Sequence, residues 1–353
     1  MNQSNLFLIF ILVVFNIFFY KYFSSIVKRY STKVLIDSQL NKPQAFHILP
    51  TSIIGGLGIY FSLLIIHFYY FQFGNTLFME YLSFCTLFFF LGFADDLKIN
   101  FNPRMRLAIM ITFLVILIKY NNFYLGQTGI EYLDFWIAKS EIFSLIFILL
   151  CFLFVVNGSN LIDGYNGLLG IHSLIILINL FIINFLYDNK DLYSYLFLGI
   201  LIITIFLVFN FPKAKTFLGD GGSYLLGTFL AISVIKTSIA IPQISPFYFC
   251  ILLFYLFFEV FFSFFRKLIK EKTSPIYPDG KHLHMLLYKI LLKKNSNKLK
   301  SNYFVSIILN LIYFCLTIPA IFMMKNGIFC KYYSILFFLI YIFSYKIAYE
   351  KIK

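Results

Sequence analysis

The sequence predicts an all-α, polytopic integral membrane protein. Of its 353 residues, 61% are hydrophobic and only 12% are charged, whereas an average soluble domain is about 45–50% apolar and about 25% charged. Soluble cores could not hide this much apolar surface, so the excess faces lipid. Backbone groups in hydrocarbon must be hydrogen-bonded internally, and the apolar runs lack the alternation of barrel strands, so the spans are predicted to be helices.

About eleven apolar runs approach the length needed to cross a bilayer, roughly 20 residues. They lie at 5–23, 53–71, 77–94, 105–120, 141–157, 167–187, 192–210, 223–241, 246–265, 303–324 and 332–349. The first run has neither a basic region before it nor a small-residue cleavage site, so we expect a retained span rather than a signal peptide. We expect one transmembrane domain covering 1–353.

The basic residues indicate the orientation of the helices. The net charge of +14 would hint at nucleic acid in a soluble protein, but in a membrane protein it first reports loop orientation. Segments on the side reached after the first span hold 22 Lys and Arg residues, against six on the other side. The positive-inside rule therefore predicts an external amino terminus and a cytoplasmic carboxyl terminus.

A long cytoplasmic loop, 266–302, carries ten of these basic residues. Its apolar residues from Leu283 to Leu291 recur at helical spacing between lysines, which predicts an amphipathic helix on the inner leaflet.

Four groups of polar residues fall on the predicted cytoplasmic side. Each joins or follows spanning helices, where carboxylates are costly and usually functional. The groups are Asp95-Asp96 with Arg104 and Arg106; 157–167 with Asn157, Asn160, Asp163 and Asn166; 217–223 with Asp220; and 278–284 with Lys281, His282 and His284. Each group alone has a plainer interpretation, as solvated loop charge, a glycine-rich helix connection or surface histidines.

Together the four groups have complementary chemistry. Clustered Asp and Asn oxygens suit Mg²⁺, which is usually held by one or two carboxylates plus substrate phosphates. Neighbouring Arg and Lys suit phosphate groups, and glycine-rich loops let backbone N–H groups approach anions. The sequence therefore predicts a phosphoryl-transfer site at the cytoplasmic membrane face. It contains neither a Walker-type loop nor a kinase signature, so ATP-driven chemistry is not supported.

The order of these motifs resembles the polyprenyl-phosphate N-acetylhexosamine-1-phosphate transferases of bacterial glycosyltransferase family 4. The likeness covers most of the chain. It rests on His47, Pro50-Thr51 and Gly55-Gly56, then Asp95-Asp96, the 157–167 motif, Gly219-Asp220 with Ser223, and His282 with His284. The family includes UDP-GlcNAc:undecaprenyl-phosphate enzymes, which the helix count resembles more closely, and phospho-MurNAc-pentapeptide transferases.

The resemblance implies that undecaprenyl phosphate attacks the β-phosphorus of a UDP-N-acetylhexosamine, giving a lipid-diphosphate sugar and UMP. It implies a catalytic role for Asp95, Asp96 and Asp163, and metal binding by Asp220 and Asn160, with Mg²⁺ or alternatively Mn²⁺. The residues it assigns to substrate binding are His47, Arg106, Asn157, Asn166, Lys281, His282 and His284.

The resemblance also implies a multi-pass protein of the bacterial inner membrane, with lipid, UDP-sugar and lipid phosphate as partners, no nucleic acid, and a homodimer as a further expectation. Three positions depart from the family pattern. Asn166 stands where many members have Asp, Met285 interrupts a histidine run, and Ile53 replaces a basic residue. These departures affect sugar specificity more than reaction class.

Several alternatives remain open at this point. A phospho-MurNAc-pentapeptide transferase uses the same motifs, and a lipid-linked saccharide transporter would also carry charges at helix ends. A transporter should place its polar groups at the midplane and show repeat symmetry, whereas these groups share one face. The sugar, the pathway (O-antigen or other lipopolysaccharide, common antigen, capsule or teichoic acid) and single or double displacement are not fixed.

Overall fold

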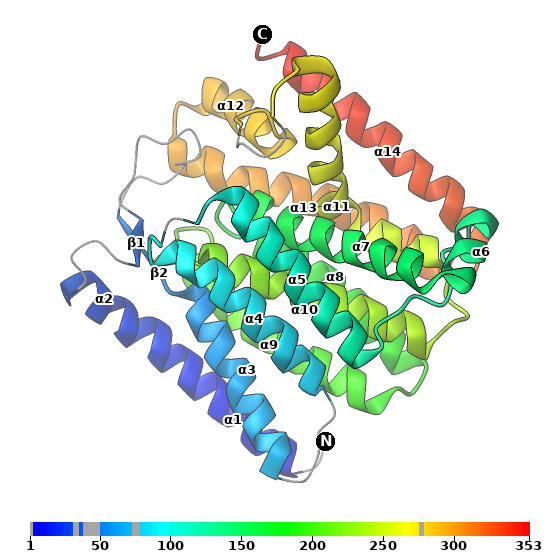
Figure 1. Cartoon of the computed structure of the whole chain (residues 1–353). Helices are drawn as coiled ribbons and strands as arrows, with labels where there is room; N and C mark the ends of the chain where they lie inside the picture. The colour runs from blue at the N-terminus through cyan, green and yellow to red at the C-terminus, as the bar shows by residue number, and fades with distance from the viewer. Residues whose placement is uncertain (1–2, 31–34, 38–49, 73–77, 100, 275–278) are drawn as a thin grey trace.

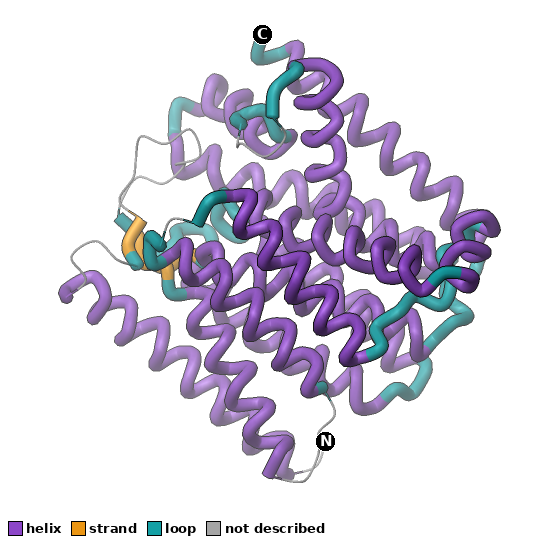
Figure 2. Tube along the Cα trace, in the orientation of Figure 1, coloured by secondary structure: helices purple, strands orange, loops and turns teal. Residues whose placement is uncertain are grey.

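The computed structural model describes residues 3–30, 35–37, 50–72, 78–99, 101–274 and 279–353 (Figure 1). Over these residues helices dominate, with three short strands at one end (Figure 2). The elements are α1 (Gln3–Phe18), η1 (Phe19–Phe23), α2 (Ser24–Tyr30), β1 (Ile36–Asp37), β2 (Thr51–Ile53), α3 (Gly55–Gln72), α4 (Met79–Asp96), α5 (Pro103–Asn121), α6 (Glu131–Lys139), α7 (Glu141–Ile162), α8 (Leu168–Leu186), α9 (Lys190–Asn210), β3 (Thr216–Phe217), α10 (Gly219–Ala240), α11 (Pro246–Phe265), η2 (Arg266–Glu271), α12 (Leu283–Asn295), α13 (Lys298–Phe322) and α14 (Gly327–Glu350).

The helices expose large apolar side chains, which confirms the all-α membrane class. Phe68, Ile142 and Val208 are each about two thirds exposed or more, at 67%, 72% and 71%. Within the described residues, eight helices are long and apolar enough to cross a membrane. Such surfaces are stable against lipid tails, which are as apolar as the side chains.

Each of the eleven predicted spans coincides with a helix. Three of these helices, however, are less apolar than the eight that are long and apolar enough to cross a membrane. They are α3, α4 and α5, and the last two each contain three charged residues. Their lengths, 18 or 19 residues, suffice to cross. A total of eleven spans therefore stays a prediction.

Several helix ends differ from the predicted boundaries, and the differences carry functional residues. Helix α4 continues to Asp96 and α7 to Ile162, so Asn157 and Asn160, which were expected in a loop, lie instead in the last turns of α7. Helix α10 begins at Gly219 rather than at residue 223, because side-chain acceptors from α4 satisfy its first N–H groups. The short helix α6 was not predicted.

Helix α10 forms the centre of the bundle, where it packs against α3, α4, α7 and α8 (Figure 1). Small residues let the neighbouring backbones approach closely. A Cβ atom on Gly56 would lie 2.5 Å from Gly222 Cα, and one on Gly92 would lie 2.3 Å from the carbonyl oxygen of Asp220. Close backbone approach of this kind is typical of helix packing in membranes.

The three strands fix the start of α3 relative to the start of α10. Strand β2 pairs antiparallel with β1 and parallel with β3, with Ser52 opposite Thr216. The hydroxyl of Thr216 donates to the carbonyl of Ser52 at 3.1 Å, and the N–H of Gly56 donates to the carbonyl of Leu218 at 2.9 Å. We call the end of the bundle with these strands and α12 the motif end.

The predicted amphipathic helix is present as α12, on the motif end (Figure 1). Its apolar residues Leu283, Met285 and Leu286 are buried, and the helix packs against α13 and α14. Much of its apolar face therefore covers the protein itself, while Lys293 and Lys294 remain exposed.

The close packing of α7 on α11 gives a test of the fold. A Cβ atom on Gly158 would lie 2.0 Å from the carbonyl oxygen of Leu256, whereas Gly126 has no atom within 4 Å of that position. We expect Gly158→Ala to lose about 1–3 kcal/mol of stability through overpacking, and Gly126→Ala to melt like the parent. The melting temperature in detergent measures both. Equal melting of the two variants would contradict this packing.

Candidate functional site

The acidic pair at the end of α4 makes two different sets of contacts. Both carboxylate oxygens of Asp96 accept backbone hydrogen bonds, from the N–H of Asp220 at 2.8 Å and of Gly221 at 2.9 Å. A carboxylate at a helix N-terminus is stabilised by the helix dipole and satisfies otherwise unpaired N–H groups. Asp95 forms an ion pair with Arg106 on α5. Asp96 therefore holds α10, and Asp95 holds a guanidinium beside it.

Asn160 connects α7 to the same helix start. Its side-chain nitrogen donates to Asp220 Oδ1 at 2.9 Å and to Ser223 Oγ at 3.0 Å. The hydroxyl of Ser223 in turn donates to the carbonyl of Asp220 at 3.0 Å. Motifs from α4, α7 and α10, distant in sequence, thus meet around Asp220.

Asp163 follows directly after α7 and completes an acidic cluster. Burial, and then the negative charges of Asp220 and Asp96, raise the pKa of Asp163 well above its ordinary value. A carboxyl group with a raised pKa in such a cluster is a candidate for acid–base chemistry or for binding a cation. The cluster lies beside the ion pair of Asp95 with Arg106.

The donor chemistry of this cluster fits Mg²⁺. Among the described residues, no three His, Cys, Asp or Glu side chains could hold a metal by themselves. Mg²⁺ needs no such set, because one or two carboxylates, waters and substrate phosphates usually hold it. Asp163 and Asp220 supply carboxylates, whereas Asn160 turns its amide nitrogen toward Asp220. The role predicted for Asn160 as a metal ligand requires that amide to be turned over.

The histidine segment lies at the start of α12 and is buried. The rings of His282 and His284 are stacked, with centroids 5.5 Å apart and planes inclined by 3°. Burial lowers the pKa of His284 to about 3, so this ring is neutral at physiological pH. His284 also contacts the ring of Tyr165, with centroids 5.7 Å apart. Tyr165 follows Asp163 by two residues, so the histidines adjoin the acidic cluster.

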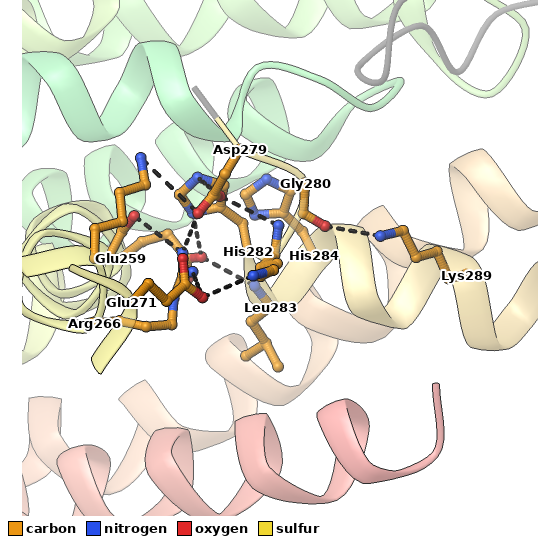
Figure 3. Close-up of polar contacts among 12 residues, drawn as sticks. Glu259, Arg266, Glu271, Asp279, Gly280, His282, Leu283, His284 and Lys289 are labelled. Carbon is orange, nitrogen blue, oxygen red and sulfur yellow. Dashed lines mark hydrogen bonds and ion pairs between the residues drawn. The ribbon is translucent and has the colours of Figure 1, made fainter. Parts of the chain in front are cut away.

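A charged network surrounds the histidines (Figure 3). Arg266 donates to Glu271 at 2.9 Å and to Asp279 at 2.7 Å. Burial alone would raise the pKa of Asp279, but the hydrogen bond from Arg266 and the nearby positive charges hold it below its ordinary value. Lys281 donates to Glu271 at 2.8 Å, which raises the pKa of the lysine. Lys281 is therefore tied into this network by an ion pair.

Three other residues predicted to bind substrate are placed elsewhere: two donate hydrogen bonds to backbone carbonyls, and one lies outside the described residues. The amide of Asn157 donates to the carbonyl of Leu153 in its own helix at 2.8 Å. The amide of Asn166 donates to the carbonyl of Pro212 at 2.8 Å, and so braces the loop after α7. His47 lies outside the described residues. Their assignment to substrate binding stays a prediction.

The sequence interpretation missed Glu259, although a signal for it was present. Glu259 is the only acidic residue in the apolar run of α11, and an ionisable residue inside a spanning helix indicates function. It contacts His282 at 3.1 Å. Arg266 was also missed, because it could not be distinguished from the other basic residues that orient the loop. Asp279 lay in the 278–284 group, from which only Lys281, His282 and His284 were chosen.

Comparison with known proteins gives a family match over the segment that carries the acidic residues. Residues 78–238 match the model of glycosyl transferase family 4, a stretch that contains Asp96, Asp163 and Asp220. Over this stretch the chain is similar to that family. The family match ends before the histidine segment.

Individual relatives fall into two groups. An undecaprenyl-phosphate alpha-N-acetylglucosaminyl 1-phosphate transferase of Thermotoga maritima is 31% identical over 235 residues, covering 65% of this chain and 66% of that protein. A phospho-N-acetylmuramoyl-pentapeptide-transferase of Dictyoglomus turgidum is 34% identical over 189 residues, 51% of this chain and 58% of that one. The matches thus span less than two thirds of these relatives.

The pKa of Asp163 gives a test of the acidic cluster. Because its folded-state pKa lies above the ordinary value of about 3.9, the folded protein binds more protons than the unfolded chain between the two values, and stability falls as pH rises through that window. We expect Asp163→Asn to melt like the parent near pH 4, and at a higher temperature above that window. Thermal melting in detergent across this pH range measures the difference.

Asp191→Asn, at an exposed position in the first turn of α9, serves as a control for the loss of one carboxylate. If the melting temperatures of the parent protein and of Asp163→Asn changed with pH in parallel, Asp163 would not be held in a cluster of negative charges.

Proposed function

We propose that this protein transfers an N-acetylhexosamine 1-phosphate from a UDP-sugar to undecaprenyl phosphate and releases UMP. The observation that carries the proposal is the meeting of Asp96, Asp163 and Asp220 at the motif end, beside Arg106. The Thermotoga and Dictyoglomus relatives, both sugar-phosphate transferases by name, support the same reaction class.

The reaction exchanges one phosphoanhydride for another. An oxygen of the lipid phosphate attacks the β-phosphorus of the UDP-sugar and forms a new P–O–P bond. The bond between the β-phosphorus and the bridging oxygen breaks, and that oxygen leaves with UMP. Both substrates are anionic, so the site must reduce their repulsion and bring the two phosphates into line.

The residues divide this work. Asp163 and Asp220 would hold Mg²⁺, which when bound supplies positive charge against the diphosphate oxygens. Arg106, fixed by Asp95, is placed to contact phosphate. Asp96 keeps the start of α10 and its Asp220 in position. The carboxyl group of Asp163, with its raised pKa, is suited to hold or release a proton near the acceptor phosphate.

The two groups of relatives suggest two different UDP-sugar donors. A UDP-GlcNAc-type donor is our first choice, because the Thermotoga relative matches the larger share of this chain. A UDP-MurNAc-pentapeptide donor is the alternative, supported by the 34% identity to the Dictyoglomus relative. A transporter is disfavoured, since the described motifs share one end of the bundle.

A direct assay tests the proposal. Purified protein given undecaprenyl phosphate, Mg²⁺ and a panel of UDP-N-acetylhexosamines and UDP-MurNAc-pentapeptide should release UMP with one donor class. Asp220→Ala should lower turnover by at least about 100-fold, because the phosphate charge loses a metal ligand.

The matched control is Asp191→Ala, which removes an exposed Asp from the first turn of α9 as Asp220→Ala does from the first turn of α10. It should keep parental turnover. No UMP from any donor in a folded sample would refute the function, and near-parental turnover of Asp220→Ala would remove Asp220 from the site.

We further propose that the motif end faces the cytoplasm of a bacterium, in its inner membrane. In a variant without native cysteines, Lys293→Cys on α12 should react with an impermeant thiol reagent only after the cells are opened. Gly126→Cys, in the loop between α5 and α6, should react in intact cells. The opposite pattern would invert the orientation, because the two positions lie at opposite ends of the bundle.

A further inference from the structure

Glu259 is a carboxylate buried in the apolar helix α11, with 1% of its surface exposed. Its Oε1 accepts hydrogen bonds from His282 Nδ1 at 3.1 Å and from the backbone N–H of Leu283 at 3.0 Å. Its Oε2 accepts a hydrogen bond from the hydroxyl of Tyr341 on α14 at 2.5 Å. One side chain thus joins α11 and α14 to the start of α12. Figure 3 labels Glu259 with His282 and Leu283.

Such a residue is costly for a membrane protein to keep. A carboxylate removed from water loses several kcal/mol of solvation, and acidic residues in spanning helices generally mark functional sites. The partners of Glu259 point to its role, since two of its contacts are with the histidine segment. It also supplies an acceptor for Leu283 N–H, the first N–H group of α12.

His282 is held between two carboxylates. Its Nδ1 lies 3.1 Å from Glu259 and its Nε2 lies 3.3 Å from Asp279, while only 4% of the residue is exposed. Asp279 is itself fixed by Arg266 at 2.7 Å. With both ring nitrogens engaged, His282 has no nitrogen left for a substrate, and it acts as an anchor.

His284 has the opposite arrangement. Its Nδ1 lies 3.2 Å from the hydroxyl of Tyr255, whereas its buried Nε2 has no hydrogen-bond partner among the described residues. When the Tyr255 hydroxyl donates to Nδ1, the neutral ring carries its hydrogen on Nε2 and can donate it to an oxygen. A buried polar atom without a partner is costly unless a ligand completes it.

We propose that Glu259 is a positioning residue for the nucleotide-sugar: through His282 and the first turn of α12, it holds His284 so that Nε2–H donates to an oxygen of that substrate. The inference rests on the proposed function and adds a division of labour between the two histidines. Glu259 then controls binding of the UDP-sugar but not of the lipid phosphate, which Arg106 is placed to contact.

The test compares Glu259→Ala and Glu259→Gln with the parent protein, using UDP-GlcNAc, or the donor found active in the panel, and undecaprenyl phosphate. We expect Glu259→Ala to raise KM for the UDP-sugar by about tenfold or more, the scale of one lost charge-assisted hydrogen bond. KM for the lipid should stay within about twofold. Glu259→Gln keeps an oxygen for Leu283 N–H and should be intermediate.

Glu80→Gln is the matched control, because Glu80 is also a carboxylate in a bundle helix, paired with Lys236 at the opposite end. Both of its KM values should be parental. A double-mutant cycle separates positioning from general damage: Glu259→Gln combined with His284→Ala should have the same KM as His284→Ala alone.

Three outcomes would overturn the inference. They are an unchanged KM for the UDP-sugar in folded Glu259→Gln and Glu259→Ala, equal rises in both KM values, or additive effects in the cycle. If Glu259→Ala does not fold, the KM values of Glu259→Gln and the double-mutant cycle with His284→Ala test the inference. Absence of UMP release from the parent protein with every donor would instead refute the proposed function.

Discussion

The site depends on one interaction, the acceptance of two α10 backbone N–H groups by the carboxylate of Asp96. These two hydrogen bonds allow α10 to begin at Gly219 and fix Asp220 at the start of the helix. They also hold α4 against α10, where Gly92 has no side chain to separate the two backbones. Asn160 on α7 then reaches Asp220 from the other side. A side chain expected to do chemistry is thus also the support on which the neighbouring groups are arranged.

Much of this was readable from sequence, because the membrane restricts the possibilities. Hydrophobic length identified every long helix, and the cost of carboxylates at a membrane boundary singled out Asp95, Asp96 and Asp220. Helix ends were less predictable: the apolar pattern stops at residue 157, yet α7 continues to Ile162 because tertiary contacts support its polar last turns. The pairing of β2 with β3 left no sequence signal, since each strand has only two or three residues.

The site also shows where reasoning from residue type reaches its limit. His282 and His284 are equivalent in sequence, yet one ring is enclosed by two carboxylates and the other keeps an unpartnered nitrogen. That difference arises from Asp279, three residues before His282, and from Glu259, which neighbours the pair in space but not along the chain. Long-range contacts of this kind decide which of two like residues is an anchor and which meets a ligand.

The short sheet has a consequence for the biogenesis of the protein. Ser52 and Thr216 are joined across 164 residues, and both β strands lead directly into helices that border the acidic cluster. A ribosome that feeds this chain into a membrane delivers α3 through α9 before β3 and α10 emerge. The helices made before α10 are therefore inserted without their central partner, so the acidic cluster is completed only late in the synthesis of the protein.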